Sequence, residues 1–181
     1  MVFIDGANLY KGVQDIRLRK PVNIEKLSHK LVGGRELVRI YYYNTPSPSS
    51  DFEEQKGHQA FLDSLGWINN LQRRMGRILP KTYSAECPKC QERVELKTHI
   101  QKGVDTRIAV DMVTFAHTDA YDVAILISGD SDLAEAVDHI REHTKKKVEN
   151  ACTSRGWAKT LRESADVKII LDAEYLKDCL L

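Results

Sequence analysis

The feature that most constrains the fold of this chain is the regular alternation of short β-forming runs with segments of helical periodicity. Runs rich in apolar, aromatic or β-branched residues occur at 2–4, 37–43, 67–71, 123–127, 147–152 and 167–171. Segments with helical spacing occur at 9–17, 24–31, 51–65, 104–118, 132–143, 156–164 and 173–180. Because strands that alternate with helices pair mostly in parallel, the pattern predicts an α/β sandwich with a mostly parallel sheet.

Composition is consistent with one folded domain over residues 1–181. The chain is 42% hydrophobic and 29% charged, and its 27 Lys and Arg residues nearly balance its 26 Asp and Glu residues. This balance excludes an intrinsically disordered chain and a histone-like basic protein. The longest apolar run, Val123–Ile127, is too short to span a membrane. Since the first residues read as a strand and cysteines are few, we expect no signal peptide, no membrane partner and a cytoplasmic location with reduced thiols.

The segment 72–103 interrupts this alternation. It has few large apolar residues and carries eight Lys and Arg residues against three Glu residues. We expect a basic, β-hairpin-like insertion with its tip at Cys87 and Cys90. A basic patch of this kind typically holds a nucleic-acid backbone, and the candidates for contacts to its phosphates are Lys102, Arg73, Arg74 and Arg77. The alternative is a solvated hairpin that contacts no substrate.

Acidic side chains stand where several of the predicted elements begin or end. Asp5 closes the first strand, Asp130 and Asp132 follow the strand at 123–127, and Asp105 enters a helix. Asn8 lies one helical turn after Asp5. Functional groups gather beyond the carboxyl ends of strands in an open α/β sheet. An oxygen-rich cluster of this kind repels itself unless a cation fills it, and hard oxygen ligands select Mg²⁺ or Mn²⁺. Such an ion activates water for attack on a phosphodiester.

Each acid has a structural alternative when it is considered alone. Asp130 or Asp132 could simply cap the following helix, and Asp105 could do the same for its own helix. Asp5 is harder to explain in this way, because an acid that closes a first apolar strand before Gly and Asn is a frequent site layout in α/β folds. Taken together, the acids favour a metal site.

In chain order, three motifs resemble those of the NYN domain, in the LabA-like branch of the PIN-like nuclease superfamily. They are Phe3-Ile4-Asp5-Gly6-Ala7-Asn8, Lys102-Gly103-Val104-Asp105 and Ser128-Gly129-Asp130-Ser131-Asp132. The resemblance covers nearly the whole chain and implies one NYN domain, with 72–103 as its variable region. It implies a Rossmann-like three-layer sandwich with strand order 3-2-1-4-5, and Mg²⁺- or Mn²⁺-dependent cleavage of RNA.

By motif position, the resemblance implies that the metal-binding acids are Asp5, Asp105, Asp130 and Asp132, and that Asn8 is the site amide. Two further residues are second-tier candidates. Ser128 opens the third motif, and Asp111 lies on the helix that Asp105 begins, six residues further on and away from the same face.

Cys87 and Cys90 have the spacing of one half of a zinc site. A structural zinc ion needs four ligands, and the second pair is missing from the neighbouring sequence. A zinc ion shared across a homodimer is one interpretation, and a reduced hairpin tip is the other. His139 and His143, four residues apart, are a weaker metal-binding candidate, because late-helix histidines commonly interact with the helix dipole instead.

Several common activities are excluded by the motifs that the sequence lacks. There is no GxxxxGK[ST] phosphate-binding loop, no GxGxxG dinucleotide fingerprint and no GxSxG nucleophile motif. Two hypotheses remain. The first is a Mg²⁺- or Mn²⁺-dependent endoribonuclease that uses the aspartate cluster, and the second is an RNA- or protein-binding regulatory module with weak or no catalysis.

Overall fold

The computed structural model describes residues 1–181 except 19, 48 and 50. Its main sheet has six strands in the order β3-β2-β1-β6-β7-β8, and every neighbouring pair is parallel. The strands are β1 (Val2–Asp5), β2 (Ile40–Asn44), β3 (Leu71–Met75), β6 (Val123–Ile127), β7 (Lys147–Cys152) and β8 (Val167–Ile170). This arrangement confirms the predicted fold class. It extends the expected five-strand order by one further strand, β8, which pairs with β7.

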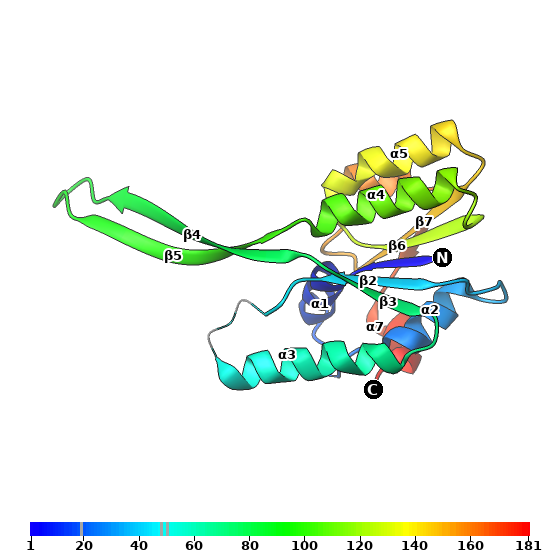
Figure 1. Ribbon diagram of the computed structural model, residues 1–181, viewed down its shortest axis with the longest axis horizontal. Coiled ribbons are helices and arrows are strands. Elements are labelled where there is room, and N and C mark those ends of the chain that lie inside the picture. The colour runs from blue at the N-terminus through cyan, green and yellow to red at the C-terminus, as the bar shows by residue number, and fades with distance from the viewer. Residues whose placement is uncertain (19, 48, 50) are drawn as a thin grey trace.

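Helices cover both faces of the sheet (Figure 1). They are α1 (Gly6–Asp15), α2 (Ile24–Val32), α3 (Phe52–Ser64), α4 (Val104–His117), α5 (Ala134–His143), α6 (Lys159–Ser164) and α7 (Ala173–Leu176), with 3₁₀ turns at Leu65–Trp67, Ser131–Leu133 and Lys177–Cys179. Two buried apolar clusters form the core, one on each face. Side chains alternate along β1, so that Ile4 packs toward α1 and α2 while Phe3 packs toward α4 and α5.

The third strand of the main sheet differs from the strand predicted at 67–71. Leu65–Trp67 forms a 3₁₀ turn, and the Trp67 side chain is 90% exposed. Asn70 then adopts a left-handed φ of 61°, which Asn tolerates better than most residues, and the strand begins only after it. Leu71–Met75 pairs in parallel with β2.

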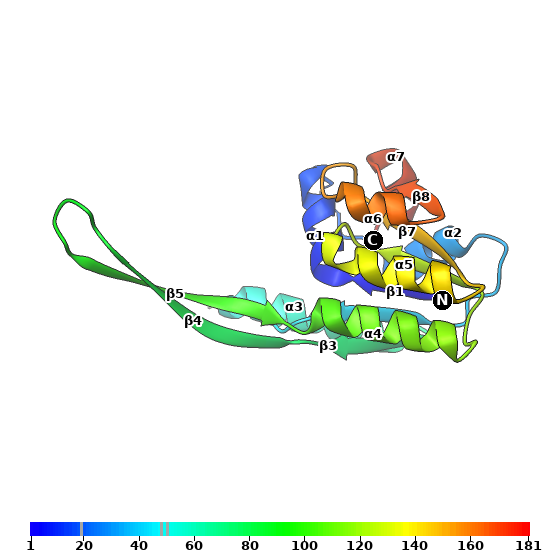
Figure 2. The same cartoon turned by 90° about the horizontal axis from the view of Figure 1, so that it is seen from above.

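This shift shortens the basic insertion expected at 72–103. Arg73 and Arg74 belong to the main sheet, and the hairpin itself consists of β4 (Arg77–Glu86) and β5 (Arg93–Lys102). These two strands pair antiparallel along their whole length. Figures 1 and 2 show the hairpin as a long arm that extends away from the sheet and its helices. No helix in the described part of the chain is long and apolar enough to cross a membrane.

Candidate functional site

Three of the four predicted acids line one cavity at the carboxyl edge of the sheet. β1 and β6 are parallel neighbours, with Ile4 opposite Ile127, so the residues that follow them emerge side by side. Asp5 ends β1, Asp130 follows β6, and Asp105 lies in the first turn of α4. The cavity has a volume of about 260 Å³ and is lined by Asp5, Ala7, Asn8, Lys11, Gln101, Val104, Asp105 and Asp130.

Asp5 is the most buried of these acids, with 5% of its surface exposed. One carboxylate oxygen, Oδ1, accepts the backbone N–H of Asn8 at 3.0 Å and so caps α1. The other, Oδ2, accepts the Ser128 hydroxyl at 3.0 Å. Burial raises the pKa of Asp5 from 3.8 to about 6, and the negative charges of Asp105 and Asp130 add to this rise while the two hydrogen bonds oppose it. Asp5 is thus a carboxylate that a bound cation would stabilise strongly.

Asn8 joins α1 to the loop that follows β6. Its side-chain oxygen accepts the backbone N–H of Gly129 at 2.9 Å. Gly129 fits there because it has no side chain: a Cβ at this position would lie 1.8 Å from the carbonyl oxygen of Gly156. The glycine of the third motif is therefore required by close packing of two backbone segments, and it holds Asn8 beside the acids.

Asp130 combines the two roles that the sequence left open. Its Oδ1 accepts the backbone N–H of Asp132 at 3.0 Å and caps the 3₁₀ turn, and its carboxylate also lines the cavity. Its own N–H donates to Ser128 Oγ at 3.2 Å, which connects it to the hydroxyl that binds Asp5. Asp132, in contrast, is exposed and is not among the residues that line the cavity.

Asp105 is the third acid of the cavity, at the start of α4. Partial burial raises its pKa, and the negative charges of Asp130 and Asp132 raise it further. The site therefore concentrates negative charge that protein side chains only partly offset, with Lys11 as the cation in the cavity lining.

The oxygen donors of the cavity suit an ion that keeps part of its water shell. Within the described ranges, no group of three His, Cys, Asp or Glu side chains is placed to hold a metal ion. Mg²⁺, however, usually keeps several waters and binds directly to only one or two carboxylates. A cavity of about 260 Å³ has space for an ion with waters, and its acids are hard oxygen donors. The residues fit a hydrated Mg²⁺ or Mn²⁺ ion in this sense, and not a closed all-protein cage.

Two cavity residues were missed by the sequence reasoning. Lys11 lies three residues after Asn8 on α1, and this helical spacing was the signal that could have identified it. Gln101 was not predicted, because its neighbour Lys102 was expected to be the residue that contacts substrate. Successive residues of a strand point to opposite faces, and Gln101 is the one that lines the cavity.

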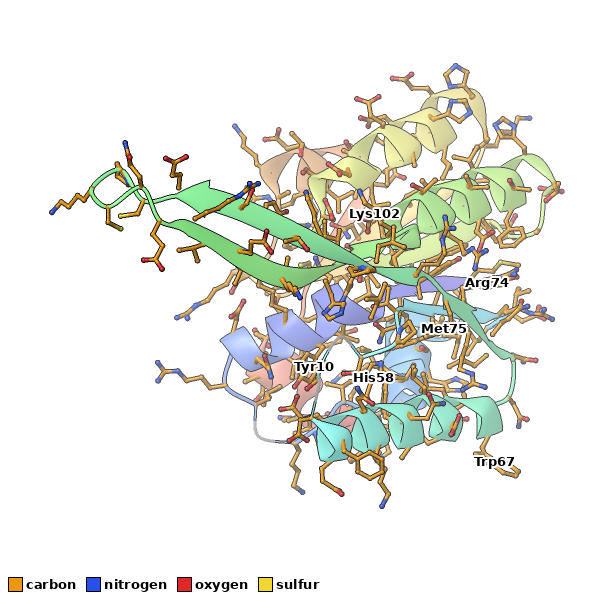
Figure 3. The ribbon with its side chains drawn as sticks, turned by 60° about the vertical axis from the view of Figure 1, so that its left-hand side comes forward. Tyr10, His58, Trp67, Arg74, Met75 and Lys102 are labelled. Atoms are coloured by element: carbon orange, nitrogen blue, oxygen red, sulfur yellow. The ribbon has the colours of Figure 1, made fainter. Side chains whose placement is uncertain are left out.

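Arg73 and Arg74 have structural partners instead of facing an open substrate path. Arg73 donates to the carbonyl of Leu62 at 2.7 Å and forms an ion pair with Asp63 at 3.2 Å. Arg74 lies 3.5 Å from Asp111 and over the ring of Tyr41 (Figure 3).

Asp111, the second-tier candidate, also accepts the Tyr43 hydroxyl at 2.8 Å. It therefore links α4 to β2 and β3. Arg77 and Lys102, in contrast, are exposed at the base of the hairpin.

The histidines near the end of α5 contact each other. The rings of His139 and His143 stack at 4.5 Å, and His139 Nε2 lies 3.0 Å from His117 Nε2.

A second, larger cavity adjoins the acidic one. It has a volume of about 1190 Å³, lies among α1, α3 and the loop after β2, and shares Ala7 and Gln101 with the acidic cavity. Tyr10 of α1 and His58 of α3 both line it (Figure 3). The Thr45 hydroxyl is buried there and has no hydrogen-bond partner in the part of the chain that the structure describes. The two cavities are therefore neighbours on either side of the shared residues Ala7 and Gln101.

We expect Asp5→Asn to increase the stability of the metal-free protein at pH 7 by about 2 kcal/mol. A rise in the pKa from 3.8 to about 6 means that ionisation of Asp5 costs the folded state roughly 3 kcal/mol, and the loss of one accepted hydrogen bond offsets roughly 1 kcal/mol. Since the folded wild type binds this proton more tightly than the unfolded chain, its stability falls as the pH rises from about 4 to about 6.

The measurement is urea unfolding in EDTA at pH 4 and pH 7 for wild type and Asp5→Asn. The variant should lack the loss of stability that this carboxyl causes between the two pH values. A variant less stable than wild type at pH 7 would contradict the assignment of Asp5 as an electrostatically unfavourable group.

Comparison with known proteins identifies a matching family and a similar fold. The model of the NYN domain family matches residues 1–172. A crystal structure of a protein of unknown function from Vibrio parahaemolyticus has a TM-score of 0.65 and 20% sequence identity, over 99% of this chain and 94% of that one. At this identity the likeness concerns the fold alone. No curated protein sequence matches the chain.

Proposed function

This chain belongs to the NYN domain family, and from that premise we propose that it is a ribonuclease that depends on Mg²⁺ or Mn²⁺. The observation that carries the proposal is the convergence of Asp5, Asp105 and Asp130 on one cavity, although they come from three separate elements. Helix capping alone would not require these three acids to share a cavity. The three-part motif further favours the LabA-like branch, and the thiol content favours a cytoplasmic protein.

Each residue of the cavity has a role in this proposal. Asp5, Asp105 and Asp130 would hold the ion, either directly or through its waters, and exposed Asp132 would contribute charge from outside the cavity. A divalent ion there would stabilise charge on the phosphate and acidify a water molecule for hydrolysis. Ser128 fixes one oxygen of Asp5, and Gly129 fixes the amide oxygen of Asn8. Lys11 would contact a phosphate oxygen.

The substrate that this geometry favours is RNA with an unpaired nucleotide at the site. The larger cavity adjoins the acidic one and offers the side chains of Tyr10 and His58. Aromatic side chains suit an unpaired nucleobase, because bases stack on aromatic rings. The nucleoside next to the scissile phosphate would occupy this cavity.

We expect the double change Arg77→Ser and Lys102→Ser to weaken RNA binding and flatten its salt dependence. The two cations lie directly opposite each other across the β4–β5 ladder, on the face that Gln101 leaves free, so an RNA phosphate bound between them outside the cavity would relieve their repulsion. Loss of two phosphate contacts should lower the slope of log affinity against log salt by up to about 1.4. Affinity is measured across a salt series in EDTA. The matched control is Arg73→Ser, since Arg73 already pairs with Asp63.

The direct test of the proposed function is incubation of purified protein with single-stranded RNA in Mg²⁺, Mn²⁺ or EDTA. Cleavage in either metal but not in EDTA is the expected result, accompanied by a higher melting temperature in millimolar Mn²⁺. The alternative, an RNA- or protein-binding regulatory module, is favoured by the lack of a three-ligand cluster among the described residues. RNA binding in EDTA without cleavage in either metal would support that module.

A further inference from the structure

The tip of the hairpin arm has the local geometry of a metal-binding turn. Cys87 and Cys90 flank a turn that is closed by two backbone hydrogen bonds, from Cys87 N to Glu92 O at 2.9 Å and from Gln91 N to Cys87 O at 2.8 Å. Within this turn, the backbone N–H groups of Cys90 and Lys89 face the Cys87 sulfur. Two cysteines three residues apart in a closed turn have the spacing of one half of a structural zinc site.

This turn supplies only half of a zinc site. Structural zinc is almost always bound by four tetrahedral ligands. Both cysteines are free thiols, and no group of three or more potential ligands exists across the residues that the structure describes. The missing pair of ligands therefore has to come from another molecule.

One face of the arm is apolar and exposed near the tip. Because side chains alternate along each strand and the β4–β5 pairing is known, Tyr83 lies opposite Leu96 and Ala85 opposite Val94 on the same face. Tyr83 is 48% exposed, Val94 59% and Leu96 64%. The pair Lys81–Thr98 interrupts this stripe, and Leu79 and Ile100 follow on the same face closer to the base.

The opposite face of the arm is polar near the tip, with Thr82, Ser84, Glu95 and Lys97. A two-stranded ribbon alone is only marginally stable in water, so a stripe of this kind is expected to be covered.

We propose that two copies of this chain pack arm against arm through these stripes and share one zinc ion, held by Cys87 and Cys90 of each copy. A second copy is the partner that satisfies both observations. It carries the two missing thiolates at the same position, and a two-fold axis along the arms brings the tips and the stripes together at once. The resulting site would have four thiolate ligands, the Cys₄ set found in structural zinc sites. This inference does not depend on the proposed nuclease activity.

The first experiment measures metal content and mass. The full chain is purified from zinc-supplemented cells with a non-thiol reductant, then analysed by elemental analysis and by light scattering on a sizing column. We expect one zinc per two chains in a dimer, which dissociates at least about tenfold more readily after removal of zinc by a chelator. Cobalt(II) reconstitution should give the absorption of a tetrahedral thiolate site. A monomer with no zinc, or with one zinc per chain, would overturn the proposal.

The second experiment uses variants of residues on the hairpin arm, outside the buried core, so that folding is preserved. Cys87→Ser with Cys90→Ser should abolish zinc binding, and Leu96→Lys should raise the dimer dissociation constant at least about tenfold. The matched control is Thr82→Lys, which adds the same charge on the polar face and should leave the dimer unchanged. Circular dichroism checks that all variants melt like the wild type. If Leu96→Lys changes only RNA affinity and leaves the mass unaltered, the stripe binds nucleic acid and the proposal is wrong.

Discussion

Asp130→Asn is expected to lower the rate of RNA cleavage by about 100-fold or more while the protein remains folded. Asparagine still caps the 3₁₀ turn, because its side-chain oxygen accepts the Asp132 N–H as the carboxylate does. The change removes one negative charge from the cavity, and a divalent ion supplies several kcal/mol of transition-state stabilisation that depends on it. A 100-fold loss corresponds to about 2.7 kcal/mol.

The matched control is Asp132→Asn, two residues away in the same loop. It removes the same charge, but Asp132 is exposed and outside the cavity lining. Its effect on cleavage should be less than about tenfold. Rates are measured in Mn²⁺ at saturating RNA, beside melting curves for each variant. Wild-type rates for Asp130→Asn would show that Asp130 acts as a helix cap and not as a metal ligand, and equal losses in both variants would show that the cavity position of Asp130 gives it no special role.

Gly129→Ala is expected to destabilise the protein by about 3 kcal/mol, and to lower its melting temperature by about 6 to 12 °C. A Cβ at this position would lie 1.8 Å from Gly156 O and 2.8 Å from Cys152 Sγ. The nearest atom belongs to the backbone, so a rotamer change cannot relieve the contact. Displacement of this loop would also break the bond from Gly129 N to Asn8, so cleavage should fall together with stability.

Gly57→Ala is the matched control for this change. Gly57 lies within α3, and a Cβ there would meet no atom within 4 Å. Alanine is the better helix former, so this variant should gain up to about 1 kcal/mol. Thermal and urea unfolding of both variants measure the contrast. If Gly129→Ala were as stable as wild type, the close packing of the 129 and 156 backbones could not be what fixes the loop.

The sequence predicted the main sheet well because its signal is local. Alternation of apolar strands with amphipathic helices identified the strands at Val2–Asp5 and Val123–Ile127 to within one residue of their ends. The third strand was misplaced, because Trp67 belongs to an apolar run whose exposure depends on tertiary structure. The strand Leu71–Met75 was not predicted because it contains two charged residues, Arg73 and Arg74, which are unusual in a strand of the main sheet. Their charges are neutralised by Asp63 and Asp111, which lie on neighbouring helices.

The residues of the candidate site also differ in whether local sequence signals could predict them. The placement of Asp5 and Asp130 followed from the rule that residues after adjacent parallel strands emerge side by side. The rule cannot resolve which residue of a turn faces inward, and so it did not separate Asp130 from Asp132. Lys11 and Gln101 belong to elements whose relative orientation only the packed fold determines, and strand alternation shows after the fact why Gln101 faces the cavity.

The hairpin arm is joined to the body through a glycine at each root. Gly76 connects β3 to β4, and Gly103, with a φ of 84°, connects β5 to α4. Asp105 lies two residues beyond Gly103. The base of the arm therefore lies next to an acid of the cavity. Because the β4–β5 ladder is continuous from the cysteine turn to this base, we expect a change in the orientation of the arm to displace Asp105 before the other cavity acids.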